Sequence, residues 1–156
     1  MSDPNPGVEV HRLLVASPQR VFAAFAEQGL VAQWLRPSPD VRLSVLAFDF
    51  RPGGAYRFAY DVPEGRRMIV GGTFRAIEAP SRIVFSWLIE PPDEHAGIDS
   101  EVTVLLVPRG SSTELTIRHA QLGRADAERR HDQGWRGALD LLEARLRQHQ
   151  GVPDAD

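Results

Sequence analysis

Alternating apolar and polar residues extend over about 80 residues from Val41 onward, and this pattern limits the possible folds more than any other feature of the chain. A period of two is typical of β-strands that have one face against a core. Segments rich in proline, glycine and serine divide the pattern into predicted strands at about residues 41–50, 55–62, 67–78, 82–90, 100–108 and 113–121. Successive strands joined by such turns pair as an antiparallel meander.

Helical patterns flank this meander, and one more strand is predicted ahead of it at residues 8–15. Ser17 and Pro18 are a typical helix start, because serine caps free backbone N–H groups and proline has none to satisfy. Two short helices are expected from there. The first should end at Gly29, and the second carries residues 30–35.

The longest helical pattern covers residues 124–148 and has one apolar face, formed by Trp135, Leu139, Leu142 and Leu146. Burying such a face against a sheet contributes roughly 1.5–3 kcal/mol per large side chain. This helix is therefore expected to be the principal core element of an α+β fold with about seven antiparallel strands.

Side-chain alternation also predicts which residues face the core. Phe48 and Phe50 share one face of their strand, and the next strand places three aromatic residues on one face: Tyr56, Phe58 and Tyr60. We take this aromatic face to be the concave one. A five-residue loop between the two strands would set Asp49 opposite Arg57, so we predict an ion pair there on the outer face.

Two strands carry unusual patterns. The strand 82–90 is apolar on both faces, which indicates either a central strand covered on both sides or a homodimer contact through Val84 and Leu88. Gly71 and Gly72 lie inside the preceding strand, where glycine indicates a bulge or a group that approaches the backbone closely.

The chain has 156 residues and a mass of 17.3 kDa, which suits one domain, placed at residues 8–149 with flexible ends at 1–7 and 150–156. Cysteine is absent, which excludes disulfides, thiolate metal sites and cysteine nucleophiles. No segment has the ~20 apolar residues of a membrane span, and the N-terminus has no basic region followed by an apolar run. We therefore expect a cytoplasmic protein with no membrane partner.

Charge and motifs restrict the function further. Arginine supplies all 18 of the Lys and Arg positions, and 21 acidic residues bring the formal charge to -3. The arginines are adjacent only at Arg66-Arg67 and Arg129-Arg130, so no nucleic-acid partner is expected. Glu128, His131 and Asp132 share a helix face without a second cluster, so no metal is predicted. Motifs for phosphate or dinucleotide binding are absent, and no cofactor is predicted.

Several motifs resemble those of the activator of heat-shock-protein ATPase homologue family. They are Ser17-Pro18 with Val21-Phe22-Ala24-Phe25, then Trp34, Phe48 to Gly54, Gly72-Thr73-Phe74, Pro80 to Trp87, Thr113 to His119 and Gly134-Trp135, in this order over nearly the whole chain. The family is a branch of the START-like (SRPBCC) helix-grip superfamily, which includes birch-pollen-allergen-like proteins and polyketide cyclases. The resemblance implies an antiparallel sheet wrapped around a long C-terminal helix, with a cavity between them for an apolar or amphipathic molecule.

The residues predicted to bind this ligand are Trp34, Tyr56, Phe58, Tyr60, Phe74, Trp87, His119, His131 and Trp135. The tyrosine hydroxyls are the first choice for orienting a polar end of the ligand. His119 faces inward by parity, and its alternative interpretation is a core histidine with a satisfied hydrogen bond. His131 lies either at the cavity mouth or on a solvated helix face. The tryptophans, too, are core residues in the alternative interpretation.

The leading hypothesis is a carrier or sequestering protein for a small hydrophobic compound. One alternative is an enzyme of cyclase, dehydratase or hydrolase type that uses the same cavity with His119 as general base, although no nucleophile–base motif is present. Another is an interaction module that dimerises or binds a partner through a sheet edge or the strand near Trp87. The chaperone activators after which the family is named carry a further N-terminal domain that this single-domain chain lacks, so a co-chaperone function is less expected.

Overall fold

One antiparallel sheet and three helices make up the computed structural model, which describes residues 7–148. The tails expected at 1–7 and 150–156 lie outside the described residues, except for Gly7. The strands are β1 (Val8–Leu14), β2 (Arg42–Phe48), β3 (Ala55–Asp61), β4 (Arg67–Glu78), β5 (Arg82–Ile89), β6 (Ser100–Arg109) and β7 (Ser112–Ala120). The helices are α1 (Pro18–Ala26), α2 (Gln28–Trp34) and α3 (Ala125–Gln148).

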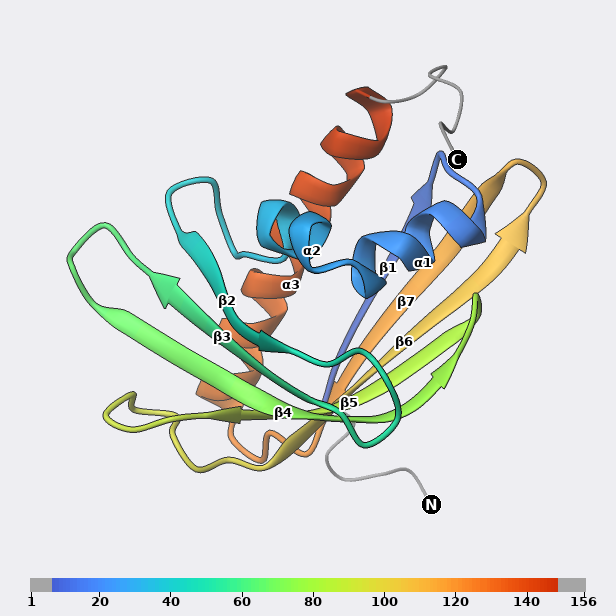
Figure 1. Ribbon diagram of the computed structural model, residues 1–156. Helices are drawn as coiled ribbons and strands as arrows, with labels where there is room; N and C mark the ends of the chain where they lie inside the picture. The colour runs from blue at the N-terminus through green and yellow to red at the C-terminus, as the bar shows by residue number, and fades with distance from the viewer. Residues whose placement is uncertain (1–6, 149–156) are drawn as a thin grey trace.

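The strand order is β1-β7-β6-β5-β4-β3-β2, in a seven-stranded sheet whose neighbouring strands are all antiparallel. The expected α+β architecture, with two short helices after the first strand and a long C-terminal helix, is confirmed. In Figure 1 the sheet bends strongly and α3 runs across its concave side. Helix α1 contacts β6 and β7, whereas α2 contacts β2 and α3.

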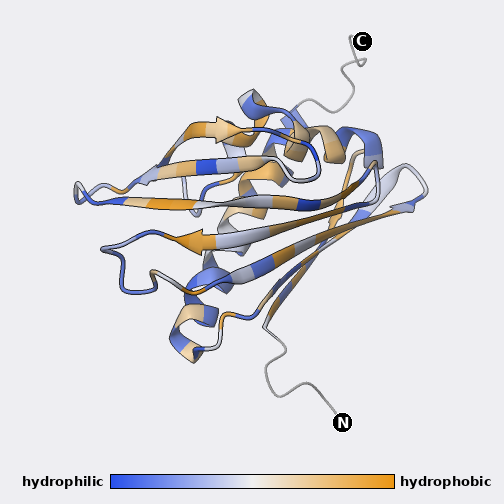
Figure 2. Cartoon of the chain, turned by 60° about the horizontal axis from the view of Figure 1, so that its bottom comes forward, coloured by the Kyte–Doolittle hydropathy of each residue, from blue (hydrophilic) through white to orange (hydrophobic). Residues whose placement is uncertain are grey.

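Apolar and polar residues alternate along the strands, as the sequence pattern requires (Figure 2). The inward residues of the sheet meet the apolar face of α3, where Leu139 and Leu142 are completely buried. Ser17 caps α1 as predicted, since its hydroxyl accepts a hydrogen bond from the backbone N–H of Arg20 at 3.2 Å. Within the described residues, no helix combines the length and apolar character needed to span a membrane.

The break between the two short helices comes earlier than predicted. Glu27 is extended and separates them, so Gly29 lies inside α2 instead of ending α1. The early break brings Trp34 back over the end of α1, where its indole N–H donates to the carbonyl of Ala24 at 2.9 Å. That carbonyl belongs to the last turn of α1 and has no partner within the helix, so Trp34 supplies the missing hydrogen bond.

The β2–β3 hairpin corrects a second prediction. Phe48 pairs with Tyr56, so the aromatic faces of the two strands do coincide. However, the loop closes two residues earlier on β2 than expected, and Arg57 pairs with Ala47. Asp49 therefore does not reach Arg57; its carboxylate lies 2.8 Å from the Arg51 guanidinium.

Arg57 instead forms an ion pair with Glu90, with Nε and Oε2 2.9 Å apart. Glu90 directly follows β5, on the far side of β4, so the side chain of Arg57 reaches across one strand. Alternation along the strand identified the outer face correctly, but it could not predict the hairpin register, which determines the ion-pair partner of Arg57.

The central position of β5 accounts for its two apolar faces. It is the fourth strand in the order, and Val84 on its outer face is already buried within the chain, whereas Leu88 is 40% exposed. Gly72 shows the predicted close approach, because a Cβ atom there would collide with the carbonyl of Ser86. The aromatic ring of Tyr56, opposite Gly72, reaches over this position and its hydroxyl donates to the Ser86 carbonyl at 2.6 Å.

Candidate functional site

A cavity of about 770 Å³ lies between α3, the α2–β2 connection, the β3–β4 hairpin and the β5–β6 loop. Its apolar wall consists of Leu35, Pro37, Val41, Tyr60, Val62, Met68, Trp87, Pro92, Trp135 and Ala138. Four of the predicted site residues line it: Tyr60, Trp87, His131 and Trp135. The cavity thus lies between the sheet and the C-terminal helix, as expected from the sequence. The structure shows that it lies toward one end of the sheet.

Small residues of α3 leave this space open. Gly134 and Ala138 face the cavity one turn apart, and a Cβ atom at Gly134 would only touch the side chain of Pro37, at 3.9 Å. At Gly137 the backbone of Pro37 comes so close that a Cβ atom would collide with its carbonyl oxygen. Glycine at 137 thus lets the α2–β2 connection dock on α3, while glycine at 134 keeps the adjoining space free.

His131 is fixed in the cavity wall by hydrogen bonds at both ring nitrogens. The indole N–H of Trp87 donates to Nε2 at 3.2 Å, and Nδ1 lies 2.7 Å from the carbonyl of Ala127. An indole can only donate and a carbonyl can only accept, so the proton of a neutral imidazole must sit on Nδ1. Burial lowers the pKa of His131, which agrees with a neutral ring. The interpretation of His131 as a solvated residue is wrong, because it is only 8% exposed.

His119 lies completely buried and does not line the cavity. Its Nδ1 accepts the indole N–H of Trp135 at 3.0 Å, and its Nε2 lies 2.8 Å from the hydroxyl of Ser100. Ser100 in turn donates to the carbonyl of Trp87 at 2.8 Å. Burial, and to a smaller degree the neighbouring His131, lowers the pKa of His119 well below its ordinary value. Its ring is a satisfied core group that holds Trp135 in place.

The two tyrosines have different surroundings, although both hydroxyls donate to backbone carbonyls. Tyr60 lines the cavity and binds the carbonyl of Leu35 at 3.0 Å, which ties β3 to the end of α2. Tyr56 lies away from the cavity, on the Ser86 carbonyl. Burial raises the pKa of both phenols, so both are neutral donors at physiological pH.

The remaining predicted site residues belong to a tightly packed aromatic cluster at the other end of the sheet. Around Phe74 the ring centroids of Phe50 and Tyr56 lie 5.0 and 5.5 Å away. Phe58 packs in the same cluster, where a small gap of about 20 Å³ remains. Trp34 is fully buried and stacks edge-on with Phe25. These side chains form core rather than cavity wall.

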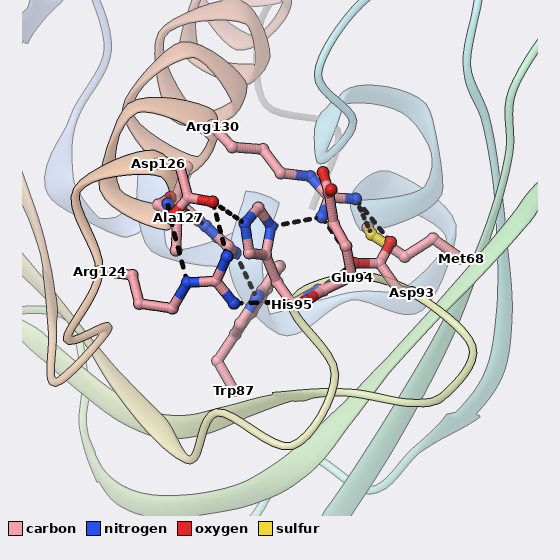
Figure 3. Close-up of polar contacts among 10 residues, drawn as sticks. Met68, Trp87, Asp93, Glu94, His95, Arg124, Asp126, Ala127 and Arg130 are labelled. Atoms are coloured by element: carbon pink, nitrogen blue, oxygen red, sulfur yellow. Dashed lines mark hydrogen bonds and ion pairs between the residues drawn. The ribbon is translucent and has the colours of Figure 1, made fainter.

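A polar cluster that the sequence did not predict lies in and beside the wall of the cavity, and Figure 3 shows its contacts. Arg130 on α3 binds both oxygens of Asp93 in the β5–β6 loop, at 2.7 and 2.8 Å, and also contacts the sulfur of Met68. This pairing holds the pKa of Asp93 at about 2, chiefly through the hydrogen bonds from Arg130. The arginine therefore ties three separate elements together across one side of the cavity.

His95 extends this cluster although it is 2% exposed. Arg130 donates to its Nδ1 at 2.8 Å, so its other nitrogen carries the proton and donates to Asp126 at 3.1 Å. Asp126 also binds Arg124, at 2.7 Å, and these hydrogen bonds lower its pKa. In the sequence, the only signals were a loop rich in acidic residues and an adjacent pair of arginines, and neither indicates which residues meet.

Comparison with known proteins agrees with this architecture. The sequence profile of the Activator of Hsp90 ATPase homolog 1-like protein family matches residues 15–147. This chain belongs to that family. No curated protein matches the sequence significantly.

Solved structures of the same family type are similar to this chain over nearly their whole length. A Chromobacterium violaceum protein is 28% identical with a TM-score of 0.81, over 92% of this chain and 98% of that one. The AHSA1 protein of Silicibacter pomeroyi is 24% identical with a TM-score of 0.81, over 92% and 99%. A Rhizobium loti protein is 31% identical with a TM-score of 0.72, over 92% and 99%. The family and the fold are thus established together.

Proposed function

We propose that this family member binds a small apolar or amphipathic molecule in the cavity between α3 and the sheet. The observation that carries the proposal is the cavity itself, because about 770 Å³ lies within the usual range of ligand pockets, roughly 300–1,000 Å³. Tyr60, Trp87 and Trp135 offer it flat apolar walls. The indole and phenol groups are already hydrogen-bonded within the protein, so these walls need no polar group from the ligand.

A binding or carrier role is favoured over catalysis in this cavity. The enzyme hypothesis relied on His119 as general base, and a general base must reach the proton that it removes, directly or through one water. Both nitrogens of His119 are engaged by Trp135 and Ser100 beneath the cavity wall. A carrier needs only the space and its lining.

The interaction hypotheses have less support. Dimerisation through β5 relied on two outward residues, and Val84 is buried without a partner chain while Leu88 remains exposed alone on that strand. The family name refers to a chaperone activator, and a partner protein of that kind stays a weaker alternative. A cytoplasmic location, and the lack of membrane and nucleic-acid partners, also stay predictions.

Thermal unfolding with a panel of fatty acids, aromatic polyketide-like compounds, flavonoids and nucleotides tests the proposal. A compound at 100 times its dissociation constant stabilises the folded state by about 2.7 kcal/mol, which raises the Tm by roughly 5–10 °C for a domain of this size. We expect such a rise with apolar or amphipathic compounds and none with nucleotides.

A matched pair of variants locates the binding. Gly134→Leu places a large side chain in the cavity, whereas Gly29→Leu makes the same change at an exposed position of α2, where a Cβ atom would touch nothing. The ligand-induced rise in Tm should disappear in Gly134→Leu and persist in Gly29→Leu. The proposal fails if no compound raises the Tm of the unmodified protein, or if the rise survives in Gly134→Leu.

A further inference from the structure

Two arginines in the cavity wall carry a positive charge that no acidic side chain of the described residues neutralises. Four arginines line the cavity, and two of them are paired: Arg67 with Asp61 at 2.9 Å, and Arg130 with Asp93 at 2.7 Å. Within residues 7–148, Arg36 and Arg66 form no ion pair. Most of the other arginines do form ion pairs within the described residues, and the net charge of the chain is -3.

Arg36 is held in place by neutral groups. Its Nε donates to the carbonyl of Gln33 at 3.2 Å, and its Nη1 donates to those of Pro39 and Val41 at 2.9 and 3.1 Å. Three backbone carbonyls fix the guanidinium without cancelling its charge. A guanidinium positioned in this way loses little side-chain freedom when it binds a further acceptor.

Arg66 lies at the same corner of the cavity. Its backbone carbonyl accepts the N–H of Val62 at 3.0 Å, at the turn that leaves β3. Arg42 at the start of β2 pairs with Asp61 at the end of β3, so Val41 and Val62 are carried on neighbouring segments. Arg36, bound to the carbonyl of Val41, and Arg66, opposite Val62, therefore flank one edge of the cavity.

The β5–β6 loop contributes acidic groups to the cavity wall. Asp93 and Glu94 come from the β5–β6 loop, and Asp93 is already neutralised by Arg130. The aromatic side chains of Trp87 and Trp135 line the wall as well. A ligand with one negative end and an apolar body would thus be oriented, with its charge near the two arginines and its body against these rings.

We infer that the ligand of this cavity is an apolar organic acid, whose anionic group binds at the corner formed by Arg36 and Arg66. This inference rests on the proposed function and specifies its ligand class. Guanidinium groups suit such a ligand because they donate paired hydrogen bonds to planar acid groups. The apolar body lies against the aromatic wall.

Two fluorescent probes that differ in one charged group test the inference. Anilinonaphthalene sulfonate is an aromatic anion, and N-phenylnaphthylamine has the same aromatic skeleton without the sulfonate. We expect the unmodified protein to bind the anion about tenfold more tightly than the neutral probe, the gain from one charge-assisted hydrogen bond. The preference should shrink in Arg66→Gln and fall to about twofold in the double variant with Arg36→Gln, since only the double variant removes the whole charge of the corner.

Controls separate this inference from the proposed function. Arg129→Gln removes the same charge from an exposed residue of α3 outside the cavity, and should keep the preference for the anion. Gly134→Leu should weaken the binding of both probes. Equal binding of both probes by the unmodified protein would overturn the inference but leave the proposed function standing, whereas binding of neither would overturn both. An anion preference that Arg66→Gln and the double variant leave unchanged would place the anion elsewhere and also overturn the inference.

Discussion

The two ends of the concave face are both lined with aromatic residues, yet one is filled and the other is open. At the filled end, rings from β2, β3, β4 and β5 leave a gap of about 20 Å³. At the open end, Tyr60, Trp87 and Trp135 surround about 770 Å³. Aromatic content alone therefore does not distinguish a core from a binding cavity.

The helices above the sheet make the difference. Over the filled end, α1 and α2 contribute Phe25 and Val31 to the cluster. Over the open end, α3 contributes Gly134, which has no side chain, and Ala138, which has only a methyl group. The small residues of the helix therefore determine the cavity at least as much as the strand residues that form its walls.

Truncating one side chain at each end should show the largest contrast. Phe74→Ala removes a ring in contact with several others at the filled end, and we expect it to lower the free energy of unfolding by about 3–5 kcal/mol. Met68→Ala removes a half-buried side chain beside space that already exists, so about 1 kcal/mol is expected. Urea unfolding measures both losses, provided that the m-value is the same for each protein.

Equal losses in the two variants would contradict the comparison, because they would mean that the open end is packed as tightly as the filled one. A Phe74→Leu variant serves as a control for the filled end. It retains much of the apolar volume, so it should recover a large part of the stability lost in Phe74→Ala.

Acid should lower the stability of the protein through two buried histidines. The pKa values of His119 and His131 are lowered in the folded state, mainly by burial. As the pH falls below about 6.5, the unfolded chain takes up protons that the folded protein does not, so the stability present above that pH is lost. Each histidine contributes a slope of at most about 1.4 kcal/mol per pH unit between about pH 6.5 and its own folded-state pKa.

Replacing one histidine tests this origin of the slope. His131→Gln should reduce the pH dependence of the free energy of unfolding below about pH 6.5, because the variant has no imidazole at this position to take up a proton on unfolding. Asp93, whose pKa is about 2, acts in a separate range, since its contribution is lost only as the pH falls below about 4. An unchanged slope in His131→Gln would show that other groups cause the acid sensitivity.

Local periodicity explains why much of the fold was predictable from the sequence. The predicted limits of the seven strands differ by at most two residues from those observed, because alternation and turn residues act locally. The inward direction of Tyr60 and His119 followed from the same alternation.

The site was less predictable because it depends on contacts between distant segments. The inward face that carries Tyr60 also carries Tyr56, Phe58 and Phe74. No local sequence signal indicates that α1 and α2 cover one end of that face. The ion pair between Arg130 and Asp93 likewise joins residues 37 positions apart. Its partners become neighbours only once α3 has docked on the sheet, just as the partner of Arg57 depends on the hairpin register.

Two glycines of α3 give the sharpest local form of the comparison, because they lie three residues apart on the same helix. Gly137→Ala should lower the free energy of unfolding by about 1–3 kcal/mol, since the new methyl group collides with the backbone of Pro37 and the connection must move. Gly134→Ala should instead raise it by about 0.5–1 kcal/mol, because alanine favours helix and its methyl group meets only ordinary contact with Pro37. Both values come from urea unfolding of the two single variants.

A gain in stability from Gly137→Ala would mean that the α2–β2 connection yields easily and is not held by α3. A loss from Gly134→Ala would mean that the space beside it is already occupied by protein, and that the open end differs from the filled end less than its volume indicates.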